Sequence, residues 1–458
     1  MSAAQAKRPL CHRFLIALAL VTAFMLSACG GEGGDTYPPF DCEQNPCDPS
    51  CYEGCSLACE PCSEACVNEG SAPALCEWGA NCDPLCDPCE TGCEACEPAC
   101  PAFLSGPELE PARCDAVALN PPGETPRRWR IEYAVPAGVP SWLLSVFTDD
   151  VQSLLGVHLT LPDASTIDLD TYDEFTLHQQ RISPAMLSMV MPSAPRYASH
   201  LQAGEHSLIV EAEGDAAPCW TLTPQLEVQK SLPFRLRVRV IGVGPSLGTL
   251  EELRENALLR DAFMETRRHF ANAEISLYVH QWLVLDDEAR MEHGEVSSFE
   301  GVSALLRSLP PPTGGDANAE LAVNVVLIDR FSGSYVLQGL TGGLPGPVSL
   351  HGSSASGVVI STALLGRSRG TDLIGALIAH ELGHYLGLRH TSSYPSGGED
   401  PLEDTPSCEE SVYKSAPFSC PDAQNMMFPL LSVNHTNHWS DEQKQVLQWH
   451  PSVTQRSE

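Results

Sequence analysis

The segment HELGHYLGLRH, from His380 to His390, limits the fold of this chain more than any other feature. An α-helix repeats every ~3.6 residues, so His380 and His384 project from one helix face, a turn apart. Gly387 permits the left-handed or otherwise sharp turn that ends a helix, after which the chain can return and bring His390 towards the other two rings. The spacing therefore predicts a helix, a turn and three converging imidazoles.

These side chains have the chemistry of a catalytic zinc site. Three neutral imidazoles can bind one Zn²⁺ at about 2 Å and leave the fourth tetrahedral position to water. We therefore expect His380, His384 and His390 to be the metal ligands. Glu381 lies on the flank where this water would sit, which makes it the candidate catalytic base. The alternative, ordinary buried histidines, does not require this spacing.

A second motif lies downstream, where the stretch Asn425–Pro429 offers Met427 as the methionine of a Met-turn. Together with HExxHxxGxxH, this arrangement resembles the metzincin peptidases. The residue after the third histidine, Thr391, and several positions beyond it narrow the resemblance to the pappalysin family, which includes bacterial secreted members. These further positions are Asp404, Thr405, Pro406, Cys408, Cys420, Pro421 and Asn425. The resemblance covers roughly residues 232 to 450.

The resemblance implies a zinc-dependent endopeptidase in which Met427 forms an apolar floor beneath the metal. It also implies Ca²⁺ near the acidic residues 399 to 404, for which a solvated loop is the alternative. We expect the protein or peptide substrate to lie extended along an edge strand within Leu340–Gly352. One departure concerns the tyrosine that such families often place just after the Met-turn. Phe428 and Pro429 stand there and cannot donate a hydrogen bond, so the oxyanion must be stabilised by the zinc or by another group.

Two other functions remain open at this stage. The chain could be a catalytically inactive zinc-binding surface lipoprotein, acting as an adhesion or scaffold module. It could also be a surface protein whose cysteine-rich segment stores or senses metal. Glu381 argues against the first, because a site that only binds zinc has no need of a base. The net charge of −33, with 59 acidic against 26 basic residues, argues against nucleic acid as a partner of any of the three.

Residues 1–29 have the pattern of a bacterial lipoprotein signal peptide. A basic start precedes the apolar residues 14 to 25, which are too few to span a membrane comfortably. Leu26 to Cys29 resembles a lipobox, so we expect Cys29 to be lipidated; an ordinary secretory signal is the alternative. This predicts a protein of the bacterial cell envelope, facing the periplasm or the cell surface, with a membrane anchor at its mature N-terminus.

Residues 30–102 are predicted to form a disulfide-rich, low-complexity stalk. Fourteen of the twenty cysteines lie between Cys42 and Cys100, among proline, glutamate and small residues that cannot build an apolar core. Behind a signal sequence disulfides are the natural interpretation, with a metal–thiolate cluster as the alternative. Two further groups of cysteines are even in number and are disulfide candidates: Cys114, Cys219, Cys408 and Cys420.

Residues 103–230 are predicted to form an all-β sandwich, because residues 129–133 and 206–211 alternate between apolar and polar side chains. Residues 201–211 are similar to the final hairpin of bacterial pre-peptidase domains. Asp168, Asp170 and Asp173 are compatible with a calcium site or a solvated turn. The domain could be a binding module, a packing partner or an inhibitory prosegment.

Residues 231–458 are predicted to form an α+β, metzincin-like domain with a mixed twisted sheet and the zinc helix. Residues 234–240 alternate apolar residues with arginines, which predicts a strand with one buried face. A helix is expected over 249–270, and strands over 275–285, 321–329 and 357–362. Thr371 or Asp372 is a candidate cap of the zinc helix, and Ser440 with Gln443 predicts a capping box for a last helix.

Overall fold

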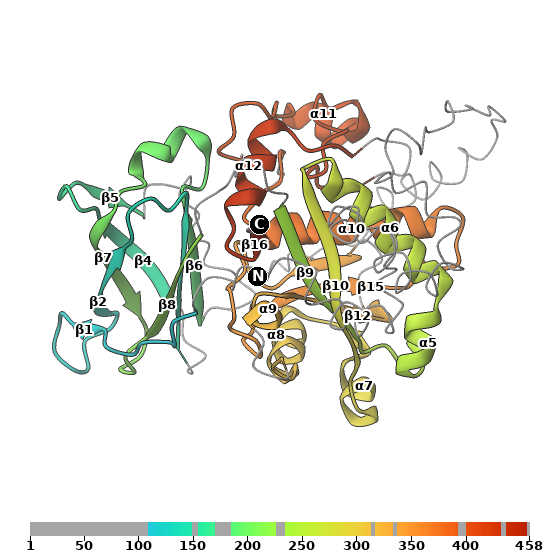
Figure 1. The fold of residues 1–458 in the computed structure, drawn as a ribbon, viewed down its shortest axis with the longest axis horizontal. Coiled ribbons are helices and arrows are strands. Elements are labelled where there is room, and N and C mark those ends of the chain that lie inside the picture. Colours follow the sequence, from blue (N-terminus) through green and yellow to red (C-terminus); the bar gives the residue numbers. More distant parts are fainter. Residues whose placement is uncertain are drawn as a thin grey trace, which may run out of the picture. The chain divides into compact units, whose positions relative to one another are not determined.

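The computed structural model describes residues 109–148, 154–169, 185–225, 234–312, 317–332, 337–392, 400–431 and 437–455 (Figure 1). The predicted signal peptide, the lipidation site Cys29 and the cysteine-rich stalk lie outside the described residues, as do Asp170 and Asp173. In the part of the chain that is described, none of the helices has the length and apolar character needed to span a membrane.

The N-terminal part of the described chain consists of two antiparallel sheets. The first has the order β1-β2-β7-β4-β5 and the second the order β6-β3-β8. The bounds are β1 Val117–Ala118, β2 Arg127–Val135, β3 Trp142–Phe147, β4 Leu154–Thr160, β5 Thr166–Asp168, β6 Met186–Met191, β7 Gly204–Ala212 and β8 Cys219–Pro224. The strands predicted at 129–133 and 206–211 are thus β2 and β7, and both alternate buried with more exposed residues.

Aromatic rings join the two sheets face to face. Tyr133 of β2 lies 5.5 Å from the ring of Trp142 in β3 and 6.2 Å from the ring of Trp220 in β8. Cys114 and Cys219 form a disulfide that fastens the segment before β1 to the start of β8. The two sheets thus share an aromatic core, in which an edge-to-face ring contact adds to the burial of apolar area.

The C-terminal part of the chain is built on a six-stranded sheet of order β10-β9-β12-β15-β14, with β16 also paired to β9. The bounds are β9 Phe234–Gly242, β10 Ile275–Val284, β12 Val323–Ile328, β14 Gly339–Thr341, β15 Gly357–Ser361 and β16 Val453–Gln455. The four strands from β10 to β15 are parallel, whereas β14 is antiparallel to β15 and ends the sheet. The sheet is therefore mixed, with β14 as an edge.

Helices cover both faces of this sheet (Figure 1). Helices α6 (Ala257–Ala271) and α10 (Gly370–Tyr385) pack on one face, and α8 (Phe299–Ser308) packs on the other. The remaining helices are η3 Pro195–His200, η4 Pro245–Leu247, α5 Leu250–Glu255, α7 Asp287–His293, α9 Ala317–Glu320, α11 Glu410–Ser415, η5 Pro417–Ser419 and α12 Asp441–Trp449; β11 Glu295–Val296 and β13 Arg330–Phe331 form a small separate sheet.

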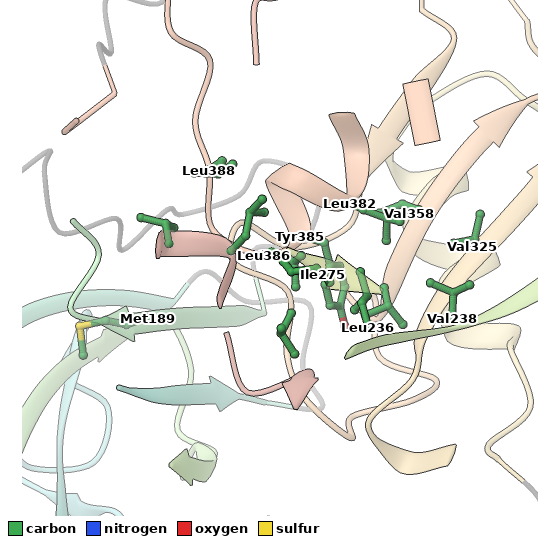
Figure 2. Close-up of a cluster of buried hydrophobic side chains, with 14 of the residues drawn as sticks. Met189, Leu236, Val238, Ile275, Val325, Val358, Leu382, Tyr385, Leu386 and Leu388 are labelled. Atoms are coloured by element: carbon green, nitrogen blue, oxygen red, sulfur yellow. The ribbon is translucent and has the colours of Figure 1, made fainter. Parts of the chain in front are cut away.

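Helix α10 lies in the main hydrophobic core. Figure 2 shows Leu382, Tyr385 and Leu386, at the end of α10, among the sheet residues Leu236, Val238, Val325 and Val358. Gly375 lets α10 approach α6 closely, since a Cβ at this position would lie 2.5 Å from the carbonyl oxygen of Ala262. The helix that carries the HELGH motif is thus fixed between the sheet and a second helix.

Three local predictions need correction. Asn256 divides the helix expected over 249–270 into α5 and α6, because its side chain caps α6 by accepting from the backbone N–H of Leu259 at 3.2 Å. Helix α10 begins at Gly370 after Arg369, which has a φ of 56°, so neither Thr371 nor Asp372 is its cap.

The predicted capping box of Ser440 and Gln443, in contrast, is confirmed at the start of α12.

The third correction concerns β9, which was expected to bury one face only. The strand is central, so both faces are covered and every residue except Arg237 is buried. Phe234, Leu236 and Val238 face the main core, whereas Arg239 is fully buried on the opposite side. The alternation of arginines with apolar residues correctly predicted a strand. The prediction that the arginine face is exposed was wrong, because Arg235 and Arg239 are buried.

Candidate metal centre

The turn predicted at Gly387 is present and has the backbone conformation that requires glycine. Its φ is 109°, a region that residues with a Cβ avoid. The backbone N–H of Gly387 donates to the carbonyl oxygen of His384 and that of Leu388 to the carbonyl oxygen of Gly383, both at 2.9 Å. These bonds close the helix and direct the next residues back over its last turn. His390 is delivered to the site by this turn.

The three predicted ligand rings meet with their Nε2 atoms together. The Nε2 of His390 lies 3.1 Å from that of His380 and 3.0 Å from that of His384. Two ligands about 2.05 Å from one tetrahedral zinc ion would be ~3.3 Å apart, so the observed separations differ by only a few tenths of an ångström from this value. The arrangement is therefore close to the one that a metal would require.

Hydrogen bonds to main-chain oxygens fix the protonation of two rings. The Nδ1 of His380 lies 2.7 Å from the carbonyl oxygen of Met426, and the Nδ1 of His384 lies 2.7 Å from that of Leu388. A carbonyl oxygen only accepts, so each Nδ1 carries the proton and donates it. In a neutral ring with the proton on Nδ1, the Nε2 carries the lone pair, and here both Nε2 atoms are directed towards His390.

Burial keeps the rings of His380 and His390 neutral. It lowers the pKa of His380 to about 4, an effect that the hydrogen bond to Met426 opposes. Burial also lowers the pKa of His390 to about 3, with the nearby His380 ring as a second cause. Protons do not compete with a cation for the lone pairs near neutral pH. The donor set thus fits Zn²⁺, which prefers neutral imidazole nitrogens.

Glu381 is buried beside His380 and faces the edge strand β14. The Oγ1 of Thr341 lies 2.6 Å from Oε2 of Glu381 and donates to it. Burial raises the pKa of the carboxyl group to about 7, and the hydrogen bond from Thr341 opposes this shift. A carboxyl group with a pKa near the ambient pH is well suited to accept a proton and to return it. Sequence reasoning did not identify Thr341 as a partner of Glu381.

Met427 is fully buried and packs against α10. A Cβ added to Gly383 would lie 2.7 Å from its sulfur, so only glycine leaves room for this contact. The backbone of the same turn has a second role, because the carbonyl oxygen of Met426 accepts a hydrogen bond from Nδ1 of His380 and that of Met427 accepts one from the backbone N–H of Thr391 at 3.1 Å. The methionine turn therefore supports the His380 ring and the segment that carries His390.

A disulfide joins the other predicted pair, Cys408 and Cys420, in the segment before this turn. The residues after His390 are attached to this segment, since Thr391 and Ser392 both donate to Oδ2 of Asp422 at 2.6 Å. The segment that contains the paired cysteines and Asp422 thus holds the residues that directly follow His390.

The acidic segment near residue 400 contains two described aspartates in different surroundings, Asp400 and Asp404. Asp404 anchors α12, because its carboxylate accepts from the hydroxyl of Ser440 at 2.7 Å and from the backbone N–H of Glu442 at 2.8 Å. Asp400 is mostly buried, and desolvation raises its pKa to about 7. Calcium at this place stays a prediction, and Glu399 lies outside the described residues.

Two of the described tyrosines, Tyr385 and Tyr413, lie close in sequence or space to the ligand candidates and to Phe428. Phe428 is fully buried and its ring lies 5.8 Å from the ring of Tyr413. Tyr385, the residue after the second ligand, donates its hydroxyl to the carbonyl oxygen of Pro347 at 2.5 Å. That hydroxyl holds a loop in place, which accounts for the burial of Tyr385.

Comparisons with known proteins add no assignment. No protein-family model matches the chain, and no curated protein matches it. Among solved structures, a mutant of Xylanase10C from Cellvibrio japonicus in complex with xylopentaose matches at 10% identity and a TM-score of 0.15. The match covers 49% of this chain and 43% of that one, and at this TM-score it carries no argument about fold or function.

Proposed function

We propose that this chain is a zinc-dependent endopeptidase of the metzincin type, similar to the pappalysins. One observation carries the proposal. The Nδ1 protons of His380 and His384 are directed to main-chain oxygens, so two Nε2 lone pairs converge on His390 next to a buried carboxylate. A structural histidine would use both ring nitrogens to bond the protein, whereas here only the Nδ1 atoms of His380 and His384 do so and the Nε2 atoms are directed at His390.

His380, His384 and His390 would hold the metal, and zinc supplies a Lewis acid that polarises a carbonyl group and lowers the pKa of water towards ~7. Glu381 takes the proton of the attacking water and delivers it to the leaving amine. The carboxyl group is suited to both steps because burial brings its pKa to about 7.

The edge strand β14 is the proposed binding place of an extended substrate. It ends the six-stranded sheet and its residues Gly339 and Thr341 lie against Glu381. An extended peptide can add to such an edge through main-chain hydrogen bonds. The strand covers Gly339–Thr341, which is shorter than the predicted range Leu340–Gly352 and starts one residue earlier.

The test is a comparison of wild type with Glu381→Gln on an unfolded protein substrate, with zinc measured by elemental analysis. We expect the variant to lose at least about a thousandfold in kcat/KM and to keep one zinc per chain, because the ligand rings are untouched. Glu292→Gln, an exposed carboxylate on α7, is the matched control and should cleave like wild type. Equal inactivity of wild type and Glu381→Gln would support the inactive scaffold instead.

We also propose that the protein is anchored in the bacterial envelope through Cys29, behind a disulfide-rich stalk. The support is the sequence pattern of residues 1–102. Mass spectrometry of the mature N-terminus tests the anchor, and an unmodified Cys29 would contradict it. The metal-storing alternative for the stalk requires zinc well above one per chain, which the same elemental analysis measures.

A further inference from the structure

The strand β14 presents alternate residues to opposite sides of the sheet. Successive side chains of a strand point in opposite directions. Leu340 packs into the core on the α8 side, so Gly339 and Thr341 point to the α10 side, where Glu381 lies. Two residues of one strand therefore contact the same carboxylate.

These two residues hold the two carboxylate oxygens differently. Oε1 lies where a Cβ on residue 339 would come within 2.7 Å, so the bare backbone of Gly339 leaves the space that this oxygen occupies. Oε2 accepts the hydrogen bond of Thr341 at 2.6 Å. The side chain of Leu377 also borders this space, since its Cδ1 would lie 2.9 Å from the same Cβ. The carboxylate is confined by shape on one side and by a hydrogen bond on the other.

The Thr341 hydroxyl has its own fixed position. Its Oγ1 lies 2.8 Å from the carbonyl oxygen of Glu381 as well as 2.6 Å from the carboxylate, and both residues are buried. A hydroxyl has one proton, which goes to the ionised carboxylate because charge-assisted hydrogen bonds are the stronger ones. The χ1 angle of threonine is stiff, so the donor loses little freedom in this contact.

We propose that Thr341 is a positioning residue that holds the general base Glu381 in its working orientation, an inference that rests on the proposed peptidase function. Thr341 acts through Glu381 and is not itself a group that reacts. Because β14 is also the proposed substrate strand, Thr341 couples the place where a peptide docks to the carboxylate that acts on it.

The experiment compares Thr341→Val, which keeps the shape and removes the hydroxyl, with Thr341→Ser, which keeps the hydroxyl. We expect Thr341→Val to lose about tenfold in kcat with little change in KM. A loss of this size corresponds to one hydrogen bond to a charged group that contributes to stabilising the transition state. Thr341→Ser should stay within about threefold of wild type. Both should hold one zinc per chain, since neither touches a ligand.

A matched control separates positioning from stability. Thr362→Val removes another buried threonine hydroxyl, which donates to the carbonyl oxygen of Ile328 at 2.9 Å, away from the base. We expect it to lower the melting temperature about as much as Thr341→Val does and to leave kcat unchanged. Equal kcat in Thr341→Val and wild type, or equal loss in Thr362→Val, would overturn the proposal.

A structural readout keeps this test separate from the proposed function. In a crystal structure of Thr341→Val we expect the Glu381 carboxylate in a different rotamer, and in Thr341→Ser the original one. An unchanged rotamer in Thr341→Val overturns the positioning role even when the enzyme is active. An inactive wild type with the expected rotamers overturns the peptidase function and leaves the positioning geometry established.

Discussion

Among the described residues of the C-terminal part, two clusters of polar side chains contain histidine, and they differ in how the histidine nitrogens are used. In the cluster of His380, His384 and His390, the Nε2 atoms are directed at one another. In the other cluster, His351 uses both ring nitrogens to bond its neighbours. Its Nε2 donates to the carbonyl oxygen of Glu320 at 2.9 Å, and its Nδ1 accepts from Arg239 at 3.4 Å and from Asn324 at 3.3 Å.

The second cluster is complete without a metal. Arg239 distributes its donors among Oε1 of Gln281 at 3.1 Å, Oδ1 of Asn324 at 3.1 Å and the carbonyl oxygen of Pro310 at 3.0 Å. A buried polar group is costly unless it is paired, and here each group pairs with another. The comparison teaches that burial and histidine content do not mark a metal site. The proposed site differs because its three Nε2 atoms converge on one point, where a single cation would bind them together.

The largest expected effect comes from removing one ring of the first cluster. His384→Ala should lose zinc and at least about a thousandfold in kcat/KM, because two imidazoles hold the metal far less firmly than three. His351→Gln, which changes the other cluster, should keep one zinc per chain. Elemental analysis after dialysis and a peptidase assay measure both. A His384→Ala protein with full zinc content would show that this ring is not a ligand, and the contrast between the clusters would fail.

The next effect concerns stability. Arg239→Met keeps most of the buried volume but leaves the acceptors on Gln281, Asn324 and Pro310 without a donor. Each unsatisfied buried acceptor costs about 1–3 kcal/mol, so we expect the free energy of unfolding to fall by about 4 kcal/mol in denaturant titrations. Zinc content should not change. A loss below ~1 kcal/mol would mean that water replaces the guanidinium, and a loss of zinc would mean that the two clusters are coupled.

The contrast also explains what the sequence could and could not predict. His380, His384, Gly387 and His390 lie within eleven residues, and a helix followed by a glycine turn brings them together by local geometry alone. Their convergence was therefore predictable. The even number of cysteines likewise predicted the bonded pairs Cys114–Cys219 and Cys408–Cys420.

Contacts between distant segments were not predictable. The hydrogen bond from Thr341 to Glu381 joins residues 40 positions apart, and that from Arg239 to His351 joins residues 112 apart. The alternation of β9 placed Arg239 on a polar face, but only the order of strands and the covering helix decide whether that face is buried. Propensity and spacing act within one element, whereas these contacts depend on which elements the fold brings together.

The smallest expected effect is a difference in pH dependence that isolates His351. Burial lowers its pKa to about 4; the hydrogen bond to the Glu320 carbonyl opposes this shift and the charge of Arg239 adds to it. In the unfolded chain the histidine has a pKa near ~6.5, so as the pH falls the unfolded state binds a proton before the folded state does. The free energy of unfolding therefore decreases with falling pH. The stabilisation is complete above pH ~6.5 and declines towards pH ~4, by about 3 kcal/mol in total.

The His351→Gln variant tests this slope directly. Glutamine does not titrate, and its amide can offer an oxygen to Arg239 and an N–H to the Glu320 carbonyl, so the network keeps one acceptor and one donor. Other buried histidines, such as His450, contribute equally to both proteins and cancel in the difference. Urea unfolding at half-unit steps from pH 4 to pH 7 should give a shallower loss of stability for the variant. Parallel curves would mean that the folded protein binds a proton at His351 as easily as the unfolded chain does. The claim that both ring nitrogens of His351 are already engaged by hydrogen bonds would then be wrong.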